Sequence, residues 1–445
     1  MKEDHLPNSG WLRKHSTPSL SEAHRSIEIP HGGSWFRKLF AFAGPGLMVA
    51  VGYMDPGNWA TDLAAGARFG YALLSVVLIS NCIAMLLQHL SLKLGIVAER
   101  DLAQACRDHY SRPVSFFLWV ICEIAIAACD LAEVIGSAIA LQLLFHIPLP
   151  IGILITALDV FVILYLQERG FRRIEAVVAA LIFVIGGCFL YEIIVSRPEI
   201  APLMAGFIPH ADLISNPAML YIAIGVLGAT VMPHNLYLHS SIIQTRNYRR
   251  DDVGKKEAIH FATIDSNLSL GLAFFVNAAI LILSAAVFHG TEHAGISDIS
   301  DAHKLLSPVV GSPWASTLFA VALLASGQNS TVTGTMAGQI VMEGFLDLRL
   351  KPWLRRLITR GIAIVPALIV AIYYGERGIG KLLVFSQVIL SLQLSFAVFP
   401  LLKFTSSKNK MGRFANTPLL KWSTYLCGFV IAGLNLYLVM QVMGS

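Results

Sequence analysis

Repeated runs of apolar residues divide this chain into segments about 20 residues long, the length that a membrane-spanning helix requires. Of its 445 residues, 55% are hydrophobic and 14% are charged, a balance that soluble domains do not need. The sequence therefore predicts an all-α membrane protein with eleven transmembrane helices. Their expected limits are residues 39–68, 71–95, 114–144, 148–167, 174–196, 217–243, 259–289, 312–342, 354–374, 380–404 and 419–442.

Lysine and arginine are divided unequally between the connecting segments. If the N-terminus is cytosolic, the cytosolic segments hold 27 of the 33 Lys and Arg residues and the outer segments hold 5. Cytosolic loops of membrane proteins carry such an excess. We therefore expect a cytosolic N-terminus and an extracytosolic C-terminus. Residues 1–37 contain no apolar run and are expected to be a cytosolic, largely disordered tail. The compact loops suggest a bacterial inner (plasma) membrane.

Several function classes find no support in the sequence. The net charge of +5 is small and scattered, so we expect no nucleic-acid partner. The six cysteines show no CxxC spacing and are interpreted as small buried apolar residues. The chain has no phosphate-binding glycine-rich loop, no HExxH and no GxSxG. We expect neither an enzyme nor a resident cofactor, and an intramembrane protease is the weakest of the alternatives.

The sequence Asp55-Pro56-Gly57-Asn58 interrupts the first span. A carboxylate at the centre of a membrane helix costs roughly 2.5–3.5 kcal/mol and indicates a functional site. Proline removes a backbone donor, and glycine accepts angles that other residues avoid, so we expect the helix to stop and restart. Unwound backbone at this depth must line protein or a water-filled cavity. Free carbonyls near Gly52, with the side-chain oxygens of Asp55 and Asn58, predict a cation site.

A matching interruption lies in the sixth span, where Met232-Pro233-His234-Asn235 follows the first motif by 177 residues. Five spans per half is an odd number, so the two halves have opposite orientations. Interrupted helices at matching places in inverted halves indicate the central site of a transporter. We predict two inverted five-helix repeats, 38–197 and 217–405, within a core of residues 38–405. Helices 1 and 6 are discontinuous, and residues 419–442 form an additional helix.

The second interruption adds the Met232 side chain and carbonyls near Ala229. Asp and Asn are hard oxygen ligands, whereas a thioether is a soft ligand that suits later divalent metals. This mixture favours Mn²⁺ or Fe²⁺, with Co²⁺ and Cd²⁺ as further cargo. Methionine in a membrane helix more often only packs. The place of Met232, at the break that corresponds to Asp55, favours the ligand interpretation.

Titratable residues cluster in the third, sixth and ninth spans. The three acids of span three share one helical face, a histidine can titrate near neutral pH, and two arginines of span nine are four residues apart. These groups either conduct protons or form a fixed ion-pair network that locks helices together. They are Glu123, Asp130, Glu133, His234, Arg356 and Arg360.

Three motifs together resemble the natural resistance-associated macrophage protein family of proton-coupled manganese and iron transporters. They are Asp55-Pro56-Gly57-Asn58, residues 232–240 (MPHNLYLHS), and residues 327–339 (GQNSTVTGTMAGQ) leading into Met342-Glu343-Gly344. The similarity covers about residues 38–440. It implies the inverted-repeat fold first known from amino-acid symporters (LeuT-like) and metal import by alternating access.

The resemblance also implies roles for individual residues. By position, Asp55, Asn58 and Met232 match the family's metal ligands, and Gly52 and Ala229 match its carbonyl donors. Gln387 matches a residue that reaches the metal in some states. The resemblance favours proton conduction through Asp55, His234, Asp130 and Glu133, with Arg356 as ion partner. Expected partners are divalent metal ions, protons and the lipid bilayer, and a monomer suffices. The alternative is a same-fold symporter of a small organic solute such as an amino acid, which leaves Met232 unexplained.

Overall fold

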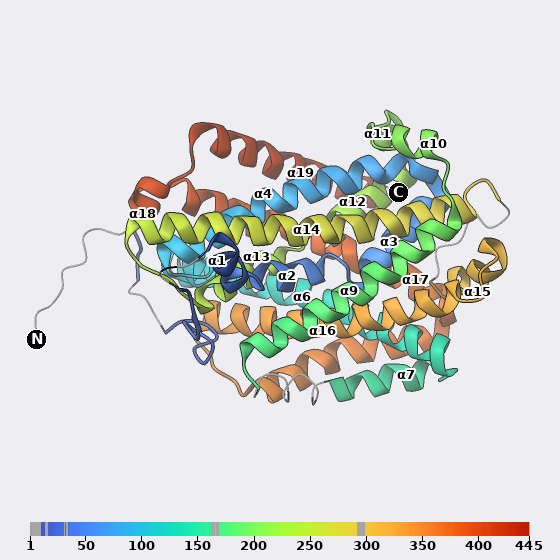
Figure 1. Cartoon of the computed structure of the whole chain (residues 1–445), viewed down its shortest axis with the longest axis horizontal. Coiled ribbons are helices and arrows are strands. Elements are labelled where there is room, and N and C mark those ends of the chain that lie inside the picture. Colours follow the sequence, from blue (N-terminus) through green and yellow to red (C-terminus); the bar gives the residue numbers. More distant parts are fainter. Residues whose placement is uncertain are drawn as a thin grey trace, which may run out of the picture.

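The computed structural model describes residues 10–13, 17–30, 32, 34–159, 161, 165, 169–291 and 299–444. These residues are almost entirely helical, and most of the long helices run along one axis of the molecule (Figure 1). In chain order the helices are α1 (Trp35–Phe42), α2 (Pro45–Gly52), α3 (Pro56–Phe69), α4 (Leu74–Ala98), α5 (Leu102–His109), α6 (Arg112–Phe145), α7 (Leu149–Ile155), α9 (Phe171–Ser196), α10 (Ile200–Ala205), α11 (Asp212–Ser215), α12 (Pro217–Thr230), α13 (Pro233–Ile242), α14 (Asp252–Phe288), α15 (Ile299–Val310), α16 (Ala315–Leu346), α17 (Pro352–Thr405), α18 (Lys408–Met411) and α19 (Pro418–Gly444). Short 3₁₀ turns are η1 (Gly70–Leu73), η2 (Thr156–Leu158), η3 (Ile243–Thr245) and η4 (Gly412–Phe414).

The two ends of the bundle differ in what they carry. Helices α1 and α18 lie at one end, and α10, α11 and α15 lie at the other (Figure 1). The first end also holds two short parallel strands, β1 (Ile27–Glu28) and β2 (Arg246–Asn247). We call it the N-terminal end and the other the opposite end.

The helices confirm a multi-pass membrane protein. Within the described ranges, eight helical segments are long and apolar enough to cross a membrane. The predicted fourth span, 148–167, begins as α7 and η2, and residues 160, 162–164, 166 and 167 of that span lie outside the described structure. The predicted spans 354–374 and 380–404 both lie in α17, as two helices that meet at a kink at Gly375 (φ 60°). Glycine accepts this left-handed backbone at little cost.

Both predicted interruptions are present. Helix α2 ends at Gly52 and α3 begins at Pro56, with Asp55 as the residue that caps α3. Helix α12 ends at Thr230 and α13 begins at Pro233, with Met232 at the corresponding place. A further break separates α1 from α2 at Gly44, whose φ of 133° disfavours any side chain. This break was not predicted from the sequence.

The interrupted helices lie in the middle of the bundle. Helix α3 packs against α14, α12 and α17, while α13 packs against α4 and α16. Every residue of α13 is buried. Helix α6, which carries the acids of the predicted third span, lies against α16 and α17. The fold therefore brings both breaks and the acidic face of α6 into one interior.

The N-terminal segment is ordered where the structure describes it. Leu20, Ile27 and Ile29 are buried, and β1 pairs with β2. The expectation of a largely disordered tail is therefore wrong for residues 17–30. Most of this stretch is polar and carries no apolar periodicity, so the sequence gives no sign of the contacts that hold it.

Candidate metal centre

Two prolines explain why one carbonyl is freed at each break. In an α-helix the N–H of a residue donates to the carbonyl four residues earlier. Pro56 has no N–H, so the Gly52 carbonyl loses its helical donor. Pro233 has the same effect on the Ala229 carbonyl. These are the two carbonyls that the sequence predicts as metal donors.

The first break leaves one side-chain oxygen of each polar residue free. Asp55 Oδ1 accepts a 2.8 Å hydrogen bond from the Asn58 backbone N–H, which caps α3. Asn58 Nδ2 donates to the Tyr53 carbonyl at 2.8 Å. Asp55 Oδ2 and Asn58 Oδ1 are buried and have no hydrogen-bond partner among the described residues. Burying such oxygens without a partner is costly, so this pair is suited to bind a cation.

The second break presents sulfur and an imidazole. Met232 is fully buried against Ala128 and Cys129 of α6 and Leu390 of α17. His234 Nε2 lies 3.8 Å from Cys129 Sγ, and in the described part of the chain His234 Nδ1 has no partner. Met232, unlike Asp55, makes no side-chain cap to its helix. Its thioether is therefore not needed for local helix structure.

Close packing places the two breaks beside each other. A Cβ at Gly52 would overlap the side chain of Asn235, in the first turn of α13. A Cβ at Gly57 would overlap the side-chain amide of Gln387, and a Cβ at Gly228 would overlap the Gln387 carbonyl. Gln387 thus lies between α3 and α12, and no described residue bonds to its Oε1. The structure brings Gln387 to both interrupted helices, next to the predicted ligands.

The acidic face of α6 forms ion pairs with α17. Arg360 Nη2 lies 3.7 Å from Glu133 Oε2 and 3.6 Å from Asp159 Oδ2. Thr331 of α16 donates to the same Glu133 oxygen at 3.2 Å. Glu133 and Arg360 are both buried. An acid of the predicted third span thus meets an arginine of the predicted ninth span, although the sequence named Arg356 as the ion partner.

The neighbouring pair involves a different arginine. Glu123 Oε1 lies 3.3 Å from Arg355 Nη2, and the Glu123 side chain is 23% exposed. The main-chain carbonyl of the buried Asp130 accepts from Arg360 at 3.5 Å. The side chain of Arg356, the predicted ion partner, lies outside the described structure.

Two features near the site had no role in the metal centre predicted from the sequence. Gln88 Nε2 donates to the Tyr53 hydroxyl at 2.8 Å, and Gln88 Oε1 lies 2.9 Å from His239 Nδ1. A glutamine inside an apolar span was the available signal. Cys129, which touches Met232, His234 and Glu133, was treated only as an apolar residue.

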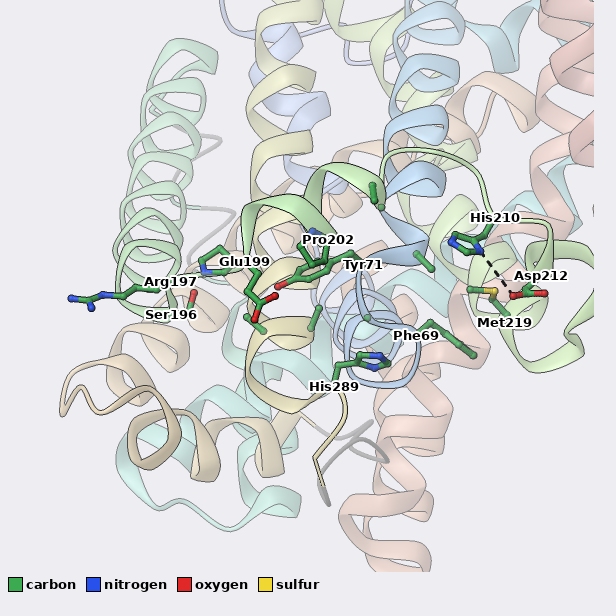
Figure 2. A pocket seen from close by; sticks show the side chains of 17 residues that line it. Phe69, Tyr71, Ser196, Arg197, Glu199, Pro202, His210, Asp212, Met219 and His289 are labelled. Atoms are coloured by element: carbon green, nitrogen blue, oxygen red, sulfur yellow. Dashed lines mark ion pairs between the residues drawn. The ribbon is translucent and has the colours of Figure 1, made fainter.

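A pocket of about 720 Å³ lies away from the breaks, at the opposite end of the bundle. Figure 2 shows Glu199, Tyr71 and His289 around it, with His210 and Asp212 forming a pair 4.0 Å apart at one side. None of the predicted ligands lines this pocket. The described residues also contain no cluster of three His, Cys, Asp or Glu side chains suited to a metal. The candidate donors are of other kinds: one carboxylate, amides, a thioether and carbonyls.

Comparisons with known proteins identify the family. The family model described as natural resistance-associated macrophage protein-like matches residues 46–441. A protein of Listeria innocua named divalent metal cation transporter MntH is 60% identical over 435 residues, covering 98% of this chain and 97% of that protein. The crystal structure of a manganese transporter of Eremococcus coleocola superposes with a TM-score of 0.87 at 45% identity, covering 94% of this chain and 90% of that chain. The nucleobase-cation-symport-1 family transporter Mhp1, at 13% identity, shares the fold with a TM-score of 0.60 over 97% of this chain and 94% of its own. The chain therefore belongs to the natural resistance-associated macrophage protein-like family.

Proposed function

We propose that this protein imports divalent transition metal ions, Mn²⁺ and Fe²⁺ first, together with protons and by alternating access. The observation that carries the proposal is the meeting of two proline-interrupted helices whose buried oxygens lack described partners, beside a buried thioether. Relatives that cover nearly the whole chain are named as divalent metal cation transporters, not as enzymes.

In the proposed site, Asp55 Oδ2, Asn58 Oδ1 and the Met232 sulfur bind the metal, with the carbonyls of Gly52 and Ala229. The carboxylate replaces part of the hydration shell and neutralises charge. The thioether favours manganese and iron over calcium and magnesium, because hard cations bind sulfur poorly. Gln387, which touches both broken helices, joins the ligands as those helices move.

The proposed proton pathway runs from Asp55 and His234 to the acids of α6. Cys129 lies between His234 Nε2 and Glu133 Oε1, 3.8 Å from each. Glu133 is held by Arg360, so release of that pair would let Glu133 take up a proton. The remaining residues of the proposed proton pathway are Asp130, Glu123 and Arg356. A static network remains the competing explanation, and proton flux measurements decide between them.

We further propose the full membrane arrangement: eleven transmembrane helices, of which ten form two inverted repeats. Helix α16 is too polar to count among the eight apolar segments, yet most of its residues are buried, which suits a helix enclosed by others. The N-terminal end faces the cytosol of a bacterium, and the C-terminus lies outside. No resident cofactor is needed, and one copy of the chain contains every proposed ligand.

The proposal is tested in proteoliposomes that contain a pH-sensitive dye. We expect uptake of manganese that iron and cadmium inhibit, with acidification of the lumen in step with metal entry. Magnesium should not inhibit at equal concentration. Uptake of an amino acid in place of manganese would instead favour the organic-solute symporter.

A further inference from the structure

Residues 17–29 cross the N-terminal end of the bundle and join two groups of elements. One group is α5 and α16. The other is η3 and β2, which continue directly from the interrupted helix α12–α13. We propose that this segment, here called the strap, holds the N-terminal end closed and must detach before metal leaves there. The inference rests on the proposed function.

The first attachment of the strap is to α5 and α16. Ser19 Oγ donates to Asp101 Oδ2 at 2.7 Å, and Asp101 caps α5. The Leu20 backbone N–H donates to Glu343 Oε2, near the end of α16, at 3.1 Å. Gln104 Nε2 donates to the Thr17 carbonyl at 3.0 Å. Asp101 and Glu343 are buried, so the strap supplies the hydrogen bond to one oxygen of each of two buried carboxylates.

The second attachment is to the chain that follows α13. The Arg25 N–H donates to the Gln244 carbonyl at 3.0 Å. Strand β1 then pairs in parallel with β2, with Glu28 opposite Asn247. These two side chains also bond, from Asn247 Nδ2 to Glu28 Oε1, at 2.9 Å. A two-stranded pair of this length is marginal by itself, so the attachment can open and reform.

The position of the strap makes it sensitive to alternating access. In transporters with inverted repeats, one group of helices rocks against the other, and interrupted helices move with it. Helix α13 packs directly against α5 and α16 in this structure. Separating α13 from them to open the N-terminal end would lengthen the path between the two attachments. The strap would then have to release one of them, and the short pairing of β1 with β2 is the one that opens. The strength of that pairing therefore sets the population of the open state.

Apolar contacts explain why the strap settles in one place. Leu20 inserts beside Met336 and Gln339 of α16 and Phe171 of α9 at a small pocket. Ile27 and Ile29 are also buried, whereas Ser26, which also lines this pocket, is exposed and its hydroxyl donates to the Ala23 carbonyl. Removal of Leu20 from its pocket would uncover the seam between these helices.

A disulfide across β1 and β2 tests whether the strap must detach. Glu28→Cys with Asn247→Cys places two thiols at paired sites whose native side chains already touch, within the reach of a disulfide. We expect loss of manganese uptake on oxidation and recovery with reductant. Glu28→Cys alone, treated with the same oxidant, controls for the six native cysteines. Equal uptake by the oxidised and reduced double variant would overturn the proposal.

A second test needs no transport. Ser19→Asp sets a carboxylate against Asp101, and like charges repel, so the strap should loosen. The native thiol of Cys106 on α5 is fully buried and should react faster with maleimide in this variant, as read by mass spectrometry. Ser26→Asp is the matched control and should leave that rate unchanged. Slow labelling of Cys188, buried on α9, reports that the variant is folded. An unchanged Cys106 rate in folded Ser19→Asp would contradict the proposal.

Failure of the strap proposal can be distinguished from failure of the proposed function. If the reduced double-cysteine protein and the native chain both fail to import manganese, the proposed cargo is wrong. The Cys106 measurement still tests the strap in that case. If the reduced protein imports manganese and oxidation changes nothing, the strap alone is refuted.

Discussion

Buried carboxylates toward the N-terminal end of this molecule differ from Asp55, at its centre, in how many of their oxygens accept a hydrogen bond. Five of the latter accept a described hydrogen bond on both oxygens: Asp101, Asp108, Glu175, Asp265 and Glu343. At the first break, the described residues provide Asp55 with a hydrogen bond on one oxygen only. The difference separates carboxylates that hold the fold from one that is available to a ligand.

The physical basis is the cost of desolvation. A buried charge is tolerated when hydrogen bonds and opposite charges compensate it, and removing one partner exposes the full cost. A buried polar atom with no partner calls for an explanation. At Asp55 the explanation that we propose is a bound metal ion. Substitutions in the two regions should therefore move transport and stability in different directions.

The largest effect should come from Asp55→Asn. Asparagine caps a helix as well as aspartate does, so α3 should remain intact while the charged ligand is lost. We expect manganese uptake to fall to background, beyond the roughly 10–100-fold loss typical of residues that only support a metal ligand. Thermal stability should stay equal or rise, because an uncompensated charge is gone. Normal uptake would refute the assignment, and a collapse of stability would remove the contrast drawn above.

Arg246→Ala should, in contrast, lower the free energy of unfolding. Arg246 Nη1 donates to Glu175 Oε1 at 2.7 Å, with both side chains buried. Its loss leaves a buried carboxylate oxygen unpaired, for an expected destabilisation of about 3–5 kcal/mol. Arg172→Ala is the matched control, because Arg172 bonds the other Glu175 oxygen from a side chain that is 45% exposed. Chemical unfolding should show a smaller loss there, and equal losses would contradict the argument.

Asp101 should make stability depend on pH at the N-terminal end. Burial raises the pKa of Asp101 from 3.8 to about 6, and hydrogen bonds from Gln104 and Ser19 offset this only in part. The folded state then holds a proton more tightly than the unfolded state. The resulting stability is present below pH 4 and is lost as pH rises through 6, by about 3 kcal/mol in total. Melting temperatures from pH 4 to 7 should fall less in Asp101→Asn, which keeps the cap. Parallel curves for the two proteins would disprove the assignment.

The smallest effect should come from Met232→Ala at the second break. Manganese uptake should persist, because the charged ligand remains. Discrimination against calcium and magnesium should fall by roughly tenfold, about 1.4 kcal/mol. Leu390→Ala, which alters the packing around Met232 without removing a donor, is the control in the same competition assay. An equal change in selectivity for both variants would make Met232 a packing residue only.

Local covalent chemistry explains what the sequence could predict. Apolar runs define the spans, and Pro56 and Pro233 end helices wherever they lie. Contacts between segments that are distant in the sequence were harder to predict. Helical spacing places Glu123 and Glu133 on one face of α6, but their register against α17 decides that Arg355 meets the first and Arg360 the second. The strap was missed because hydrogen bonds such as Ser19 to Asp101 leave no pattern in the sequence.

The two carbonyl oxygens at the breaks have a consequence for genetics. Gly52 and Ala229 would contribute main-chain oxygens, which every amino acid has. In a library of single substitutions, the effect on transport at these two positions would therefore depend mainly on the size of the new side chain. The influential codons would be those of Pro56 and Pro233, four residues later, where any other amino acid restores an N–H able to engage the oxygen. Two of the five proposed donors would thus depend on two imino acids that are not themselves ligands.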